Sequence, residues 1–257
     1  YYLLALTVLS ATSRRRRLVA VVGVFVCVVA AFASGDRQEI DNSLRCTVLD
    51  VGHGSAAVVE FSDGKTILID AGAMNRGERA GDQITAFLWH HGYRHLHAIL
   101  VSHADMDHYN AVPAIPGRIS VAELMTSRQV AKSDSWSVQA FLDDVDQHGI
   151  PIRIVADGLA LNSAGAAIRL LQADDSRLPL DADDNASSLV VVIEYAGRRI
   201  ILPGDLEFEG AHELLSDMAA TDVLVSPHHG ATTANTAQLA SVVQPRHVIV
   251  SARDASS

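Results

Sequence analysis

Residues 101–111, VSHADMDHYNA, constrain this chain more than any other segment. They place His103, Asp105, Asp107 and His108 within six residues, directly after the apolar run LHAIL, which predicts a buried strand. Imidazole and carboxylate are ligands that Zn, Mn and Fe accept. In a chain with 49% hydrophobic residues, such a cluster at a strand end requires compensation, which a divalent cation provides. The alternative interpretation is a solvated acidic turn with unrelated histidines.

Three further strand ends carry the same kinds of side chain. Asp70 ends the run ILID, Asp205 follows IIL in LPGDLE, and His228 with His229 follows VLV in SPHHG. Glycine stands close to each of them, which allows a sharp turn or a close approach of the backbone to a ligand. Each motif alone is typical of a surface turn, but together they predict one shared site where several strands end.

From residue 35 onward, short apolar runs and amphipathic segments predict one α/β domain. The expected strands cover residues 44–51, 56–61, 65–70, 96–101, 122–125, 152–155, 167–171, 189–195, 199–202, 223–226 and 247–251. The expected helices cover residues 83–91, 135–148, 208–218 and 234–243. This order indicates two packed sheets with helices outside. The acidic loop of residues 174–184 is either a mobile lid or a solvated loop.

Residues 1–34 differ in composition from the rest of the chain. Residues 1–10 are almost wholly apolar, Arg14 to Arg17 follow, and residues 18–33 carry no charge. One hypothesis is one or more membrane segments with a cytoplasmic arginine loop, and the other is a secretory signal ending at Ala31-Phe32-Ala33. The apolar residues before the arginines and the missing initiator Met favour the membrane hairpin and a piece of a longer protein. Both hypotheses predict that residues 35–257 face the extracytoplasmic side, and the favoured membrane hairpin predicts a location at the cell membrane.

The charge of the chain limits its partners. The net charge is −10, and residues 1–34 carry four Arg and no acid, so the remainder carries −14. This argues against a broad basic surface for gripping nucleic acid. A polyanionic substrate therefore has to be held by metal ions and a few local cations. Cys27 and Cys46 form no disulfide framework or metal motif, and we expect both to be buried filler.

The motif HADMDH resembles the HxHxDH signature of the metallo-β-lactamase fold, with Asp105 in place of the second histidine. The full set of motifs is most similar to one branch, the C-terminal domain of ComEC-type DNA-uptake channel proteins. The matching stretches are LDVGHGSA (49–56), ILIDAG (67–72), VSHADMDH (101–108), NASSLVVVIEYAGRRIILPGD (185–205) and VSPHHGATTA (225–234). The resemblance covers residues 44–251 and implies an αββα sandwich preceded by a transmembrane segment.

The chain departs from that pattern at three places. His53-Gly54-Ser55 stands where the family usually has Gln-Gly-Asp, and Ala231 replaces the familiar Ser after HHG. The final motif VIVSARD lacks the Asn segment that follows it in the family, which predicts a C-terminally truncated domain. These differences leave the expected ligands intact and affect the positioning of substrate.

The resemblance implies a site for two divalent ions, Zn²⁺ or Mn²⁺. His103 and Asp105 are expected at one ion, Asp107 and His108 at the other, and Asp205 as the bridge. From the histidine pair the expected ligand is His228, with His229 as a second candidate or a proton donor.

Other matched positions are expected around the ions. Asp70 is expected to orient a ligand histidine, and Asn185 and Ser188 to contact substrate. Thr232 is expected near a phosphate of the substrate. For His53 three roles stay open: an extra ligand, a phosphate contact, or a packed turn histidine.

The implied activity is hydrolysis of phosphodiesters, with Asp107 or Asp205 accepting the proton of the attacking water. The first hypothesis is a nuclease domain of a DNA-uptake channel, acting on DNA, expected to be single-stranded, beside other uptake components. The second is another extracytoplasmic phosphodiesterase of this fold. The third is a non-catalytic module that guides DNA to a membrane pore.

Overall fold

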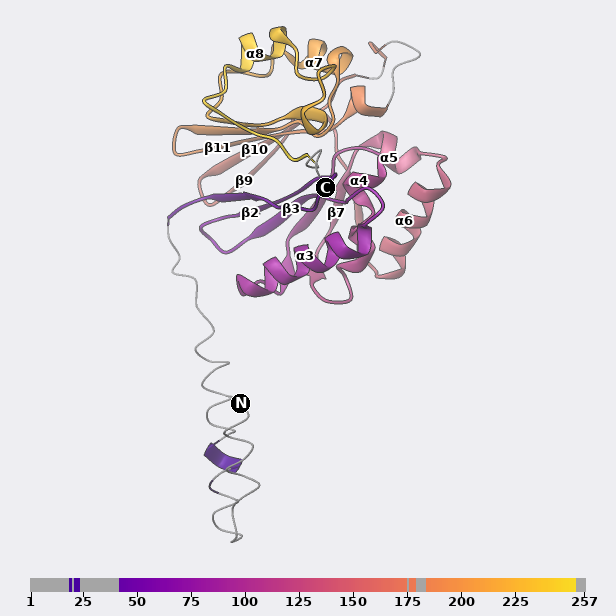
Figure 1. Cartoon of the computed structure of the whole chain (residues 1–257), viewed down its shortest axis with the longest axis vertical. Helices are drawn as coiled ribbons and strands as arrows, with labels where there is room; N and C mark the ends of the chain where they lie inside the picture. The colour runs from indigo at the N-terminus through magenta and orange to yellow at the C-terminus, as the bar shows by residue number, and fades with distance from the viewer. Residues whose placement is uncertain (1–18, 20, 24–41, 175, 179–183, 253–257) are drawn as a thin grey trace. The chain divides into compact units, whose positions relative to one another are not determined.

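The computed structural model describes residues 42–252 apart from 175 and 179–183, together with residues 19 and 21–23 (Figure 1). The chain divides into two compact units, Tyr1–Glu39 and Ile40–Ser257, and the fold below is that of the second. The predicted membrane segment of residues 1–34 lies outside the described residues except at 19 and 21–23. Within the described parts of the chain, no helix is both long and apolar enough to cross a bilayer.

The first sheet has the strand order β1-β2-β3-β5-β7-β8. Its strands are β1 (Arg45–Val48), β2 (Ala56–Glu60), β3 (Thr66–Ala71), β5 (Ala98–Val101), β7 (Leu124–Thr126) and β8 (Ile152–Ile154). β1, β2 and β3 are antiparallel neighbours, whereas β3, β5, β7 and β8 run parallel. The carboxyl ends of β3, β5 and β7 therefore meet at one edge of the sheet.

The second sheet has the order β14-β13-β12-β11-β10-β9. Its strands are β9 (Leu159–Ser163), β10 (Ala166–Leu171), β11 (Val190–Tyr195), β12 (Arg198–Leu202), β13 (Val223–Val225) and β14 (His247–Ile249). β9 to β12 form an antiparallel meander, and β12, β13 and β14 are parallel. This sheet also brings several carboxyl strand ends to one edge.

Successive side chains of each strand point to opposite faces of its sheet, and the packing on both faces gives a four-layer sandwich. In β3, Leu68 packs toward the helices while Ile69 packs between the sheets, and in β11 Val192 and Ile193 divide in the same way. Helices α3 (Gly77–His90) and α6 (Trp136–Gln147) cover the outer face of the first sheet, and α7 (Phe208–Leu214) and α8 (Ala237–Val243) cover the second sheet (Figure 1). The prediction of two packed sheets with helices outside is confirmed.

Several element bounds differ from the predicted ones. α3 begins at Gly77 instead of residue 83, and α7 ends at Leu214 instead of residue 218. The edge strand β9 and the short pair β4 (His95–Leu96) and β6 (Ser120–Val121) were not predicted. Two further short helices, α4 (Met106–Tyr109) and α5 (Arg128–Lys132), were also missed. Four or five residues are too few for a helical period to emerge from the sequence.

Cys46 partly fits the expected filler role. It lies in β1, is half-buried, packs against the core between the sheets, and is a free thiol. Burial raises the pKa of this thiol to about 12, and the nearby Glu60 carboxylate adds to the shift. The thiol is therefore protonated at neutral pH and unreactive. Cys27 lies outside the described residues.

Gly72 is the point where three loops of the first sheet pack most closely. A Cβ atom on Gly72 would lie 2.3–2.5 Å from backbone atoms of Asp107 and His108. A Cβ atom on Gly54 would in turn lie 2.3 Å from the carbonyl oxygen of Gly72. The loops after β1, β3 and β5 therefore touch through backbone, which only glycine permits.

We predict that Gly72→Ala lowers the free energy of unfolding by about 3 kcal/mol, because the backbone of α4 has to move to admit the methyl group. The matched control is Gly117→Ala, since nothing lies within 4 Å of a Cβ built at Gly117. That control should change the free energy of unfolding by less than about 0.5 kcal/mol. Urea unfolding followed by circular dichroism measures both. Equal stability of the two variants would contradict the close approach described here.

Candidate metal centre

The first sheet contributes one group of polar side chains to the common edge. β5 leads into Ser102 and His103, and α4 follows with Asp107 and His108. The single turn of α4 buries Asp107 and His108, whereas Met106 is 48% exposed. Of the three consecutive residues 106–108, Asp107 and His108 therefore face the interior, and Met106 faces solvent.

The second sheet contributes the other group. β12 is followed by Gly204 and Asp205, and β13 by the 3₁₀ turn η3 (Pro227–Gly230), which carries the histidine pair. A Cβ atom on Gly204 would lie 2.9 Å from Oγ of Ser102, so glycine lets the two sheets' loops approach closely here. Asp205 is 3% exposed. Loops far apart in the sequence are therefore held against each other at this edge.

His103, His108 and Asp205 form the first group of possible ligands, with one ligand atom of each within 4.8 Å of the others. Nε2 of His108 lies 3.0 Å from Oδ1 of Asp205, and Nε2 of His103 lies 4.0 Å from Oδ2 of Asp205. The two imidazole ring centroids are 4.1 Å apart. All three side chains are buried.

Asp107, His229 and His53 form a second group that meets the same 4.8 Å limit. Nε2 of His229 lies 3.2 Å from Oδ2 of Asp107, and Nε2 of His53 lies 3.9 Å from the same oxygen. Nε2 of His229 is also 3.6 Å from Oδ2 of Asp205. Asp205 therefore lies between the two groups.

Hydrogen bonds at the opposite ring nitrogens fix which histidine nitrogen carries the proton. Nδ1 of His108 lies 2.8 Å from a carboxylate oxygen of Asp70, and Nδ1 of His229 lies 2.8 Å from the carbonyl oxygen of Ser251. Both oxygens accept only, so each Nδ1 donates. In the neutral ring, Nε2 is then a lone pair that points into the site.

Nδ1 of His103 is also a hydrogen-bond donor. The Ser102 hydroxyl donates its single hydrogen to Asp70, at 3.0 Å. Nδ1 of His103, 2.9 Å from that hydroxyl oxygen, therefore donates to it. Asp70 also accepts from the backbone N–H of Ser102 at 2.8 Å, so one buried carboxylate organises both histidines of the first group.

These nitrogens fit a bound cation. Nε2 of His103, His108 and His229 are buried and have no hydrogen-bond partner among the described residues. Each faces carboxylate oxygens, and when the ring is neutral its Nε2 lone pair is directed at them. Buried polar atoms are normally satisfied, and a group that accepts lone pairs from both sides is a metal ion. The donor set of imidazole and carboxylate suits Zn²⁺ or Mn²⁺.

The pKa values respond to the same charges. Burial lowers the pKa of His108, but the carboxylates of Asp70 and Asp205 outweigh it and hold that pKa well above its ordinary value. Burial raises the pKa of Asp205, but His108, His103 and His229 outweigh it, and the net pKa is far below the usual range. The pKa of Asp107 is likewise lowered: burial raises it, and His229 and His108 together more than reverse this. Both aspartates are therefore ionised near neutral pH.

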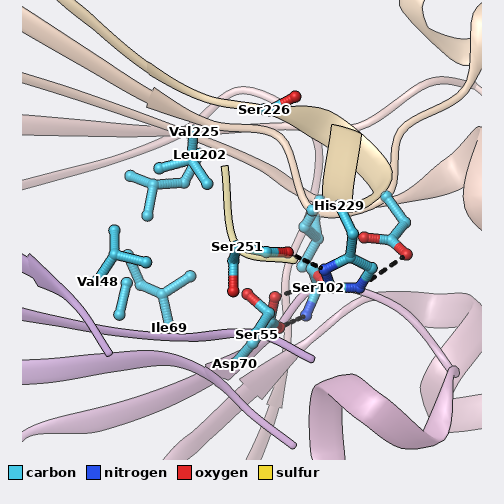
Figure 2. A pocket seen from close by; sticks show the side chains of 14 residues that line it. Val48, Ser55, Ile69, Asp70, Ser102, Leu202, Val225, Ser226, His229 and Ser251 are labelled. Atoms are coloured by element: carbon cyan, nitrogen blue, oxygen red, sulfur yellow. Dashed lines mark hydrogen bonds and ion pairs between the residues drawn. The ribbon is translucent and has the colours of Figure 1, made fainter. Parts of the chain in front are cut away.

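A cavity of about 20 Å³ lies behind His229, between the two sheets (Figure 2). Asp70 and Ser102 line it from the first sheet, and Ser251 lies beside His229. This volume holds about one water molecule. A larger substrate has to approach from the outer side, where the side chains of His53 and Asp105 are 44% and 49% exposed.

The structure groups the predicted ligands differently from the sequence. His108 lies with His103 and Asp205, not with Asp107, because its ring is turned toward Asp205 by Asp70. Asp105 stays beside His103, with 3.5 Å between Oδ2 and Nε2, and is half-exposed. Asp105 is thus at the rim of the first group.

The two neighbouring histidines of η3 take different positions. His229 enters the second group, whereas Nδ1 of His228 is 2.7 Å from the Glu207 carboxylate and its Nε2 is 3.8 Å from Asp205. The His228 side chain is 32% exposed, at the mouth of the site. Both histidines have positive φ, 47° and 52°, a conformation that costs a residue other than glycine energy.

The remaining predicted residues lie around this centre. Asn185 and Ser188 are buried, and neither the Oδ1 atom nor the Oγ atom has a hydrogen-bond partner within the described parts of the chain. Ser188 sits beside Gly204. Thr232 is exposed, in the turn after η3. The sequence did not single out three residues that hold the site together: Ser102, Glu207 and Ser251.

Comparison with known proteins found a family model and several curated relatives. A family model described as beta-lactamase superfamily domain matches residues 65–254. Among curated proteins, ComE operon protein 3 of Bacillus subtilis is 26% identical over 80% of this chain and 28% of its own length. Competence protein ComA of Neisseria gonorrhoeae is 23% identical over 88% of this chain and 30% of its own length. The chain thus spans less than a third of either relative.

Solved structures support the fold. Zn²⁺-bound PqqB from Methylobacterium extorquens superposes with a TM-score of 0.50, at 19% identity, over 67% of this chain and 59% of that one. Sequence identity at this level shows a shared fold and nothing about a shared function. The metallo-beta-lactamase fold protein YhfI from Bacillus subtilis superposes with a TM-score of 0.51, at 12% identity, over 83% of this chain and 98% of that one, so the described arrangement shares this fold.

We predict that Asp70→Asn weakens Zn²⁺ binding by about 10- to 100-fold, because an amide replaces the carboxylate that fixes the His108 tautomer. Asn tolerates the left-handed backbone of residue 70, where φ is 54°, so the backbone need not change. Competition with a chromophoric chelator measures the affinity. The control is Asp82→Asn, an exposed residue paired with Arg118. Identical affinities of both variants would show that Asp70 does not orient a ligand.

Proposed function

The chain belongs to the beta-lactamase superfamily domain family, and from this membership we propose that it is a metal-dependent hydrolase that cleaves phosphodiester bonds in DNA. The observation that carries the proposal is the pair of histidine–aspartate groups joined through Asp205. A solvated turn does not bury three imidazoles whose lone pairs face carboxylates. The arrangement favours a hydrolase over a module that only guides DNA.

We propose that two divalent ions, Zn²⁺ or Mn²⁺, belong to this site. His103, His108 and Asp205 hold the first, and Asp107 and His229 hold the second, with Asp205 reaching both. When bound, such a pair lowers the pKa of water to about 7 and neutralises charge on the reacting phosphoryl group. A ligand set without sulfur suits either metal.

The protein's own residues have distinct tasks in this proposal. Asp70 and the Ser251 carbonyl keep the ligand histidines in the required tautomer and orientation. Asp107 or Asp205, both ionised near neutral pH, accepts the proton of the attacking water. His228, held by Glu207 at the exposed mouth, faces the incoming substrate.

The names of the relatives support DNA as substrate. Competence protein ComA and ComE operon protein 3 match this chain over most of its length. Because the chain spans under a third of each, we propose that it is the hydrolase part of a larger DNA-uptake protein. In this proposal the domain faces the extracytoplasmic side of the cell membrane, acts on single-stranded DNA and works beside other uptake components.

We predict that the purified chain cleaves single-stranded DNA with Mn²⁺ or Zn²⁺ and that EDTA stops the reaction. Asp107→Ala should reduce the cleavage rate by about 100-fold or more, because it removes both a ligand and a candidate proton acceptor. Gel analysis of an end-labelled oligonucleotide measures the rate.

Asp144→Ala is the control for this assay, since Asp144 lies on α6 and is not one of the proposed ligands. Cleavage by Asp107→Ala at the wild-type rate would reject the site. Tight binding of DNA without cleavage under any metal would instead favour the guiding module.

A further inference from the structure

We infer that His53 is a ligand of the second metal ion beside Asp107, His229 and the shared Asp205, an inference that rests on the proposed function. His53 lies in the loop between β1 and β2, ahead of the region matched by the family model, which begins at residue 65. The family match therefore does not assign it. The geometry of three separate loops points to it.

The imidazole of His53 faces the second group directly. Its Nε2 lies 3.9 Å from Oδ2 of Asp107, and its ring centroid lies 4.8 Å from that of His229. The three side chains come from the β1–β2 loop, α4 and η3, so they surround one point from three directions. A turn histidine packed beneath the site would not be 44% exposed with its Nε2 toward a buried carboxylate.

The backbone of this loop is fixed by the same residues that position the other ligands. The carbonyl oxygen of His53 accepts the Met74 N–H at 2.7 Å, and the Ser55 N–H donates to the carbonyl oxygen of Asp107 at 3.0 Å. The Ser251 hydroxyl donates to the carbonyl oxygen of Gly54 at 2.8 Å, and the Ser251 carbonyl accepts from His229. His53 is thus held in register with Asp107 and His229.

His53 completes the donor set around the second ion. Asp107, His229 and the shared Asp205 give one imidazole and two carboxylates. With His53 the set becomes two imidazoles and two carboxylates, one of them shared, all of them ligand types that zinc binds.

Metal counting on the full 257-residue chain tests the inference without an activity assay. Wild type should bind two Co²⁺ or Zn²⁺ ions per chain, measured by calorimetric titration and by elemental analysis after dialysis. His53→Gln should keep the first ion at unchanged affinity and bind the second at least about 100-fold more weakly. His53→Glu, which restores a ligand of similar reach, should regain the second ion and its Co²⁺ absorption spectrum.

The matched control is His148→Gln, because His148 has a similar side-chain exposure of 37% and lies at the end of α6. Two ions of unchanged affinity in His53→Gln would overturn the inference and leave the proposed hydrolase intact. A second ion lost equally in His53→Gln and His53→Glu would also overturn it, since a phosphate contact or a packing role then accounts for the residue. Fewer than two ions in wild type would reject the proposed two-ion site together with this inference.

Discussion

The hydrogen bonds at the Nδ1 atoms of the site histidines determine everything else at this edge of the sandwich. Asp70 holds His108, and through Ser102 it also holds His103, while the Ser251 carbonyl holds His229. Because each Nδ1 is committed as a donor, each Nε2 lone pair is directed at an aspartate oxygen. Cations between these atoms would bind the neutral Nε2 lone pairs and the aspartate oxygens together. Asp70 is the penultimate residue of β3 in the first sheet and Ser251 follows β14 of the second, so neither sheet alone can build the centre.

These contacts require strained backbone conformations, and the hydrophobic cores must offset the energy of that strain. Asp70, His228 and His229 all have positive φ, at about 1–3 kcal/mol each for residues other than glycine. Gly72 and Gly204 let backbone pass where a methyl group would collide. The three apolar layers supply the stability: α3 and α6 pack on the first sheet, the two sheets pack on each other, and α7 and α8 cover the second. Three of the seven non-glycine residues with positive φ in the described part of the chain thus lie where the polar side chains converge.

The convergence of these side chains could be predicted from the sequence, whereas the way they group in the structure could not. Asp70, Asp205 and the HADMDH motif follow apolar runs, and parallel strands necessarily bring such ends together. The grouping of His108 with Asp205 depends on the direction of one ring, which Asp70 sets from 38 positions away. The different positions of His228 and His229 depend on Glu207 and Ser251, each about twenty residues distant. Local patterns carry no information on such contacts. Glu207 ends the LPGDLE motif, but nothing in that motif indicates its contact with His228.

Charge explains how an acidic domain can serve a polyanionic substrate in the proposed function. Residues 35–257 carry −14, so the domain as a whole repels DNA at long range. Close to the centre, Asp70, Asp105, Asp107, Asp205 and Glu207 contribute five negative charges, and two divalent ions would contribute four positive ones. Loading the site would therefore cancel most of the local negative charge where the reacting phosphate has to lie. A domain of this kind gains little from diffusional capture and depends on a strand delivered to it. That requirement agrees with a chain that spans less than a third of the curated relatives it matches.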